Sequence, residues 1–210
     1  MKLFLASASN TLSLMAQRLP KRGKGAKVIF IANASDNLSG DKWWIRNDRN
    51  AFKKMKCEVV DLDLRKIDSK EFSKSLKNAS VVHFCGGSVL YLISLINKKR
   101  LKPALIRTIR RGKTIYSGTS AGSMITAADL KLSSYDGEDR EYVKKMKDFS
   151  GLGLVDFLII PHVNNVDFLG GNVRIIKQLH KNLQPLIFID DNKAVLVEDD
   201  KIKIISVKST

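Results

Sequence analysis

One serine of the sequence stands in a setting typical of a catalytic nucleophile. Ser120 is the centre of Gly118-Thr119-Ser120-Ala121-Gly122, a Gly-x-Ser-x-Gly pentapeptide between an apolar run and an expected helix over Ser123–Ala128. The residues two before and two after the serine must be small, because strand and helix approach each other closely in such a strained turn. The hydroxyl then projects above the sheet, and the next backbone N–H, that of Ala121, faces a developing oxyanion at the positive end of the helix. We therefore predict a nucleophile elbow at Ser120.

A serine hydroxyl needs a base near neutral pH, and the sequence has 3 histidines. His180 lies in a basic helical stretch, where solvation is expected, and His83 lies in an apolar run, where a core histidine with satisfied hydrogen bonds is the usual outcome. His162 follows the apolar run Phe157–Ile160, just beyond the carboxyl end of an expected strand, where open α/β sheets hold their sites. His162 is the predicted base.

The base in turn needs a carboxylate to fix its tautomer, and two are suitably placed. Asp136 lies in the charged segment after the elbow and would give the chain order Ser, Asp, His. Asp191 lies in Ile189-Asp190-Asp191-Asn192, at the end of a later apolar run. Sequence spacing does not choose between them, and both remain candidates.

A second oxyanion donor is expected where two glycines separate a strand from a helix. In Phe84-Cys85-Gly86-Gly87-Ser88 the glycines leave backbone N–H groups unobstructed. A plain strand-to-helix turn explains this segment equally well when it is taken alone. Gly87 is the candidate donor.

Short apolar runs and amphipathic stretches alternate along the chain up to the elbow. The expected strands are Leu3–Ala6, Val28–Ala32, Val59–Leu62, Val81–Cys85 and Thr114–Tyr116. The expected helices are Leu12–Leu19, Trp43–Met55, Lys70–Leu76, Val89–Ile96 and Pro103–Arg110. This alternation predicts an α/β fold with a mostly parallel sheet covered by helices on both faces.

After the elbow the pattern is looser. Lys131–Ser150 is rich in charge and is expected to be a surface excursion, followed by a strand at Phe157–Ile160 and a helix over Val173–Leu183. The chain then has three expected strands joined by tight turns, at Leu186–Ile189, Ala194–Val197 and Ile202–Val207. No repeat or linker interrupts the sequence, so we expect residues 1–210 to form a single domain.

Composition limits the classes of function. A chain of 210 residues buries enough surface to fold without disulfides or a structural metal. The net charge of +16 raises the question of nucleic-acid binding, but the basic residues are scattered and accompany no nucleic-acid module, so solvated surface lysines are the preferred interpretation. A positive field also steers an acidic substrate toward the protein.

The lengths of the apolar runs and the two cysteines predict the cellular compartment and the need for a metal or cofactor. No apolar run approaches the ~20 residues of a membrane span, and Leu3–Ala6 is too short for a signal peptide. Cys57 and Cys85 do not suggest a disulfide framework and lack the spacing of a metal site, which favours reduced thiols in the cytoplasm. No metal and no cofactor are expected.

Together these motifs resemble peptidase family S51, the aspartyl dipeptidase (peptidase E) and cyanophycinase group, whose fold is similar to that of class I glutamine amidotransferases. The likeness extends over almost the whole chain and rests on these segments: the opening strand, Gly86-Gly87, Tyr116–Gly122, Gly151-Leu152-Gly153-Leu154, Pro161-His162 and Ile189-Asp190-Asp191. The resemblance implies a three-layer αβα, flavodoxin-like fold. It makes Ser120 the nucleophile and His162 the base, with Gly87 and Ala121 as oxyanion donors and either Asp136 or Asp191 as the triad acid.

The same resemblance implies a serine peptidase of small, acidic peptides, above all dipeptides with an N-terminal aspartate. In aspartyl dipeptidases an arginine downstream of the histidine recognises that aspartate, and Arg174 looks like its counterpart, although its distance in sequence from His162 is compressed relative to the family. The family's usual Gly-Gly-Asn is Gly86-Gly87-Ser88 here, so the side-chain contact of Ser88 to substrate differs. An exposed helix arginine is the competing interpretation of Arg174.

Three other functions fit parts of the sequence. A serine esterase of the α/β-hydrolase type shares the elbow, but it places its histidine nearer the C-terminus, and this chain lacks a His-Gly-Gly motif. A non-catalytic binding protein on the same fold is the second, and an amidotransferase, which requires a cysteine in the elbow, is the third. The oligomeric state is left open between monomer and homodimer. Trp43-Trp44 is expected to pack into the core rather than line a pocket or close over the site.

Overall fold

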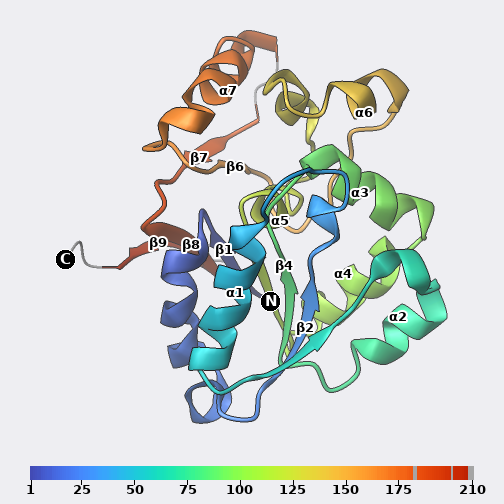
Figure 1. The fold of residues 1–210 in the computed structure, drawn as a ribbon, viewed down its shortest axis with the longest axis vertical. Helices are drawn as coiled ribbons and strands as arrows, with labels where there is room; N and C mark the ends of the chain where they lie inside the picture. The colour runs from blue at the N-terminus through green and yellow to red at the C-terminus, as the bar shows by residue number, and fades with distance from the viewer. Residues whose placement is uncertain (182–183, 200, 208–210) are drawn as a thin grey trace.

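The apolar runs form a central sheet in a computed structural model that describes residues 1–181, 184–199 and 201–207. Within these residues the sheet has seven strands in the order β3-β2-β4-β5-β1-β8-β9 (Figure 1). The strands are β1 (Lys2–Ala6), β2 (Lys27–Ile31), β3 (Glu58–Asp61), β4 (Val81–Phe84), β5 (Ile115–Thr119), β8 (Lys193–Glu198) and β9 (Lys201–Ser206). The pairs from β3 to β1 are parallel, whereas β8 is antiparallel to β1 and to β9.

Alternation along each strand divides the core into two halves, one on each face of the sheet. On β1, Leu3 and Leu5 pack into one half, and Phe4 and Ala6 pack into the other. The first half is covered by α2 (Ser69–Ser75), α3 (Val89–Lys98) and α4 (Lys102–Arg110); the second is covered by η1 (Ser9–Arg18) and α1 (Trp43–Lys54). Figure 1 shows these two groups of helices on opposite sides of the strands. The predicted three-layer αβα architecture with a mostly parallel sheet is confirmed.

Short elements connect the layers. They are η2 (Pro20–Gly23), η3 (Asn33–Ser35), η4 (Leu64–Lys66), α5 (Ala121–Met124), η5 (Lys131–Tyr135), α6 (Arg140–Lys145) and η6 (Leu179–Lys181). The expected helix at Leu12–Leu19 is the 3₁₀ helix η1, in which a period of three places Leu12 and Met15 on one face, both fully buried. The charged segment Lys131–Ser150, expected as a surface excursion, also packs inward, since Leu132 and Asp139 are buried.

The helix expected over Val173–Leu183 is displaced. The observed helix, α7 (Val166–Ile176), begins earlier because the side chain of Asn165 accepts a hydrogen bond of 3.0 Å from Asp167 N and caps it. Residues 182–183 of the expected helix lie outside the described residues.

Two further strands form a second, smaller sheet. Within the described residues, β6 (Leu158–Ile160) and β7 (Leu186–Phe188) form a separate parallel pair, with Ile160 opposite Phe188. The register ends both strands at the same level. The turns that follow them are therefore neighbours, although Phe188 lies 28 positions after Ile160 in sequence.

The tryptophan pair does not behave as expected. Trp43 is 55% exposed, so core packing was the wrong prediction for it, and its ring lies edge-on against Trp44. Trp44 is half-buried and donates its indole N–H to Ser35 Oγ at 3.0 Å. Separately, no helix in the described part of the chain has the length and apolar character of a bilayer-spanning segment.

Candidate active site

The turn at Ser120 is strained and closely packed. Ser120 has φ 49° and ψ −115°, a conformation that residues other than glycine rarely adopt. A Cβ at Gly118 would overlap the Gly122 backbone, and a Cβ at Gly122 would overlap the carbonyl of Phe84. The hydroxyl of Ser123 connects the turn to two strands, with hydrogen bonds of 2.8 Å to Ala6 O of β1 and to Gly118 O of β5. The small residues of the pentapeptide are thus required by direct backbone contacts.

The helix after this turn is shorter than expected. α5 is a single turn, Ala121–Met124, where the sequence suggested Ser123–Ala128. A helix this short adds little dipole field. The amide of Ala121, rather than a macrodipole, is what the turn offers to negative charge.

A glycine turn from the neighbouring strand lies against the elbow. β4 is adjacent to β5 in the sheet, and a Cβ at Gly86 would lie 3.2 Å from Ser120 Cβ. Gly87 has φ 141°, and a Cβ there would overlap the carbonyl of Ala34. Outside helices and strands, neither Gly87 nor Ala121 donates its amide to a backbone carbonyl in the described part of the chain. Both N–H groups are available near Ser120.

The imidazole of His162 connects Ser120 to a carboxylate. His162 Nε2 lies 2.9 Å from Ser120 Oγ, and His162 Nδ1 lies 2.5 Å from Asp191 Oδ1. His162 follows β6 and Asp191 follows β7, so the paired ends of the small sheet bring them together. The ring of Phe168 stacks on the imidazole, with centroids 4.3 Å apart. A hydrogen-bonded chain of hydroxyl, imidazole and carboxylate results.

A second hydroxyl supports this chain, and sequence reasoning missed it. Ser7, fully buried beyond the carboxyl end of β1, donates to Asp191 Oδ1 at 2.8 Å and accepts a hydrogen bond of 2.8 Å from His162 N. Its hydroxyl is also 3.4 Å from His162 Nδ1. The signal was a polar residue directly after the apolar run Leu3–Ala6, a position similar to the one that singled out His162.

The two candidate acids have different surroundings. The hydrogen bond with His162 holds the pKa of Asp191 below its ordinary value, despite partial burial. Burial raises the pKa of Asp136 to about 7, and the nearby carboxylates of Glu138 and Asp139 add to the rise. Asp136 Oδ1 accepts a hydrogen bond of 2.8 Å from Glu138 N. The structure brings Asp191, and not Asp136, into hydrogen-bonding contact with His162.

Asp136 nevertheless lies at the pocket that contains the serine. The lining of this pocket comprises Gly87, Val89, Ser120, Met124, Asp136, Glu138, Pro161, His162, Phe168, Gly171, Asn172 and Ile175. Asp136 and Glu138 are its acidic members. These two acidic side chains add a negative contribution to the electrostatic field in the pocket, although the net charge of the protein is +16.

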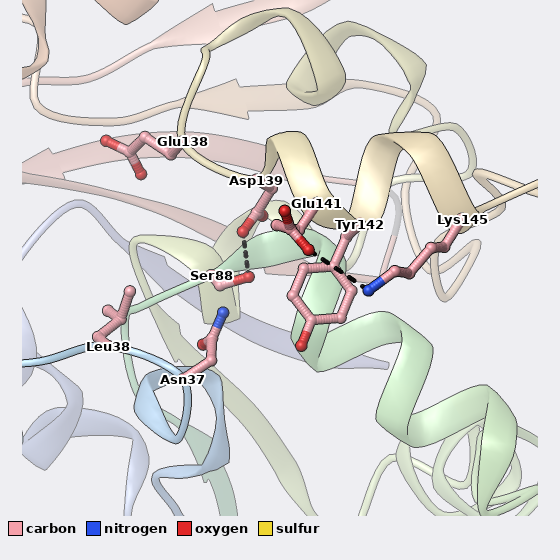
Figure 2. A pocket seen from close by; sticks show the side chains of 8 residues that line it. All are labelled: Asn37, Leu38, Ser88, Glu138, Asp139, Glu141, Tyr142 and Lys145. Carbon is pink, nitrogen blue, oxygen red and sulfur yellow. Dashed lines mark hydrogen bonds and ion pairs between the residues drawn. The ribbon is translucent and has the colours of Figure 1, made fainter.

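A larger cavity of about 370 Å³ adjoins this pocket, and Glu138 lines both. Figure 2 shows its walls, formed by Asn37, Leu38, Ser88, Glu138, Asp139, Glu141, Tyr142 and Lys145. Ser88 caps α3 by accepting from Tyr91 N at 3.0 Å and donates its hydroxyl to the buried carboxylate of Asp139. Ser88 thus faces the cavity next to the serine pocket and already has protein partners.

Arg174 lies beside the pocket on α7. Its Nε donates to the carbonyl of Asp136 at 3.0 Å, and its Nη2 donates to the same oxygen. The side chain is exposed, and its guanidinium lies against the backbone of Gly137. The structure places this charge next to Asp136 and does not include it among the residues that line the pocket.

The other histidines behave as expected. His180 is exposed, and His83 is buried with hydrogen bonds to Ser117 Oγ at 2.9 Å and Asp48 Oδ2 at 3.1 Å. Asp48, His83 and Cys85 form the one trio of potential metal ligands found among the described residues, within 4.8 Å of one another. Both ring nitrogens of His83 and Oδ2 of Asp48 already have hydrogen-bond partners, so we assign the trio no metal.

The fold and this chain of side chains define a serine hydrolase of the α/β class. The particular family is given by a family model, Peptidase family S51, which matches residues 3–205. The chain belongs to peptidase family S51, and it is a serine-type peptidase. The resemblance to this family is confirmed, and the esterase and non-catalytic alternatives are set aside.

Individual relatives agree with this assignment. The chain is 28% identical over 199 residues to an uncharacterized peptidase of Pasteurella multocida, covering 95% of this chain and 94% of the relative. It is 29% identical over 140 residues to a peptidase E of a Nostoc species, covering 64% of this chain and 55% of that protein. A crystal structure of a candidate peptidase E from Listeria monocytogenes EGD-e superimposes with a TM-score of 0.87 at 20% identity, covering 99% of this chain and 98% of that one. At this level of identity, the structural similarity shows that the two chains share a fold.

Proposed function

We propose that this peptidase hydrolyses small peptides, with a preference for dipeptides with an N-terminal aspartate, through Ser120, His162 and Asp191. The observation that carries the proposal is the pair of contacts made by one imidazole, 2.9 Å to the hydroxyl of Ser120 and 2.5 Å to the carboxylate of Asp191. This is the geometry that general-base activation of a serine requires. No metal or cofactor takes part in the proposed reaction.

The reaction is acyl transfer in two halves. Ser120 Oγ attacks the scissile carbonyl while His162 Nε2 accepts its proton. The amides of Gly87 and Ala121 donate to the tetrahedral oxyanion, where charge develops only in the transition state. His162 then protonates the leaving amine, and water repeats the sequence on the acyl-enzyme to release the acid.

Asp191 is the proposed triad acid. As a carboxylate it accepts a hydrogen bond from the Nδ1–H of His162 and stabilises the imidazolium that forms during attack. Its depressed pKa, caused by the hydrogen bond with His162, keeps it ionised across the neutral range. The hydroxyl of Ser7 occupies a further lone pair of Asp191 Oδ1 and so fixes the carboxylate.

The substrate is proposed to be small because the space around Ser120 is limited. The adjoining cavity of about 370 Å³ matches the lower end of ligand sites. Arg174 provides the proposed positive charge for an N-terminal aspartate, by turning its guanidinium from the Asp136 carbonyl toward the pocket. Protonation of Asp136 below about pH 7 removes one opposing charge. Peptidase E is also the name of the Nostoc relative.

A location in the cytoplasm and a monomeric or homodimeric state complete the proposal. Cys57 and Cys85 are both free thiols, which suits a reducing compartment.

Replacement of the nucleophile tests the mechanism. Ser120→Ala is expected to lower kcat on Asp-X dipeptides by roughly 10⁶-fold and to prevent labelling by a fluorophosphonate. Ser75→Ala, on α2 and away from both pockets, is the matched control and keeps wild-type turnover. Wild-type turnover by Ser120→Ala would contradict the proposal, as would labelling at another serine.

A further inference from the structure

Helix α1 turns two side chains toward the loops that carry the reaction groups. Trp44 and Asp48 are separated by one helical turn and therefore share a face. Asp48 is 1% exposed, and Trp44 is half-buried. Each begins a chain of hydrogen bonds that ends next to a group used in the proposed acyl transfer.

The branch from Trp44 reaches the glycine turn. The indole N–H donates to Ser35 Oγ at 3.0 Å, and the hydroxyl of Ser35, itself buried, donates to Gly86 O at 2.8 Å. The preceding residue of η3, Ala34, accepts a hydrogen bond of 2.8 Å from Ser88 N. The Gly86 carbonyl and the Ser88 amide, on either side of Gly87, are thereby tied to η3, and Trp44 ties η3 to α1.

The branch from Asp48 reaches the strand that ends at the nucleophile. Asp48 Oδ2 accepts a hydrogen bond of 2.6 Å from Thr119 Oγ1, and His83 Nε2 lies 3.1 Å from the same oxygen. His83 Nδ1 pairs in turn with Ser117 Oγ at 2.9 Å. The two hydroxyls come from alternate positions of β5, and Thr119 immediately precedes Ser120. All four side chains are buried.

A buried polar network of this kind is a poor device for stability alone. Well-packed apolar residues in place of a buried charged pair are often neutral or stabilising. The polar groups instead fix geometry, because each hydrogen bond sets the distance between two specific segments of the chain. The two branches end at Gly86 and Thr119, whose neighbours carry the proposed oxyanion donor and the nucleophile.

We propose that α1 sets the position of the Gly87 amide relative to Ser120 Oγ, with Trp44 and Asp48 as its positioning residues. This inference rests on the proposed function. The two ends of the network meet where Gly86 packs on Ser120, with a distance of 3.2 Å from an added Gly86 Cβ to Ser120 Cβ. Release of either branch lets one end move against the other. A displacement near 1 Å costs about 100-fold in rate when it misplaces reacting groups.

Two conservative variants test the branches separately. Trp44→Phe removes the indole donor and keeps an aromatic ring, and Thr119→Val removes the hydroxyl and keeps the branched shape. The matched controls are Trp43→Phe on the same helix and Thr114→Val, whose buried hydroxyl donates to Ala79 O at 2.9 Å near the other end of β5. Turnover is measured per active site, after titration of the reactive serine with a fluorophosphonate, and Tm is recorded for each protein.

Trp44→Phe and Thr119→Val are expected to lower kcat by about 10- to 100-fold with KM within about threefold, because the transition state, more than the bound substrate, uses the oxyanion donors. Both controls are expected to keep the wild-type kcat, whatever their Tm. A lower Tm with an unchanged kcat per active site in both test variants overturns the inference and leaves the proposed function standing. Wild-type protein that neither hydrolyses small peptides nor takes the label overturns the proposed function, and this inference with it.

Discussion

Among single residues, the two aspartates that are candidates for the triad acid differ in what their carboxylates contact. Asp191 contacts His162 Nδ1 at 2.5 Å, whereas the Asp136 carboxylate accepts a hydrogen bond from the amide of Glu138. The difference arises because Asp191 follows a strand that is paired with the strand before His162, whereas Asp136 follows η5 and its carbonyl is held by Arg174 of α7.

Amide variants of the two aspartates make this difference measurable. Asp191→Asn keeps the shape of the side chain but favours the wrong tautomer of His162, so kcat is expected to fall by roughly 10⁴-fold. Asp136→Asn, the matched variant, is expected to keep kcat within about tenfold. Steady-state kinetics at pH 7.5 distinguish the two variants. A larger loss in Asp136→Asn than in Asp191→Asn would reverse the assignment of the acid.

The raised pKa of Asp136 predicts a pH-dependent cost to stability. Its carboxyl has a pKa of about 7 in the fold and an ordinary value near 3.8 when unfolded, so the native state binds the proton more tightly. Stability therefore falls as the pH rises from about 4 to about 7, and the cost is complete above the folded pKa.

Asp136→Asn removes that ionisation. The variant is expected to exceed wild type in unfolding free energy at pH 8 by an amount on the order of a few kcal/mol, and to match it near pH 4. Urea unfolding at the two pH values measures the difference. An equal offset at both pH values would show that charge is not its cause.

At the level of secondary-structure elements, the strand-to-helix turn requires glycine at positions 118 and 122. A Cβ at Gly122 would overlap the carbonyl of Phe84, which belongs to the neighbouring strand and cannot move without disturbing the sheet. The strained conformation of Ser120 is held by these contacts, since nothing in the serine itself favours φ 49°.

Gly122→Ala is accordingly expected to destabilise the protein by about 2 kcal/mol or more and to lower the labelling rate of Ser120. Gly170→Ala on α7 is the matched control, since its added Cβ meets only the flexible end of Arg174, at 3.4 Å. There we expect a gain of about 0.5–1 kcal/mol from helix propensity and reduced unfolded-state entropy. Thermal or urea unfolding of both variants checks the opposite signs.

At the scale of the whole molecule, charge acts at long range. The net charge of +16 comes from 37 basic and 21 acidic residues, while the serine pocket itself contains Asp136 and Glu138. The global field attracts an acidic peptide during approach, and the local carboxylates act only after contact.

Salt separates these two contributions. For an Asp-X dipeptide, kcat/KM is expected to fall several-fold as ionic strength rises from about 0.02 M to about 0.5 M, because the Debye length shrinks toward a few ångströms. An Ala-X dipeptide of the same length is the control and is expected to change little. The same salt dependence for both peptides would contradict electrostatic steering.

The fold class and most of the groups that meet at the site could be predicted from the amino-acid sequence. Alternating apolar runs predicted the three-layer architecture, because the burial of both sheet faces leaves that pattern in any parallel sheet. The elbow at Ser120, the turn at Gly87 and the choice of His162 are local signals at the carboxyl ends of strands. They depend on small residues and polar positions that a linear sequence displays.

Which of these groups contact one another could not be predicted without the three-dimensional fold. The contact of His162 with Asp191 and not with Asp136 depends on the register of β6 and β7, a sheet that no sequence pattern distinguished from the main one. The hydrogen bonds of Ser7 and of the α1 side chains join distant parts of the chain. One example is the bond from Thr119 to Asp48. A hydrogen bond between such segments is set by strand order and helix placement, and these follow from the packing of the entire core.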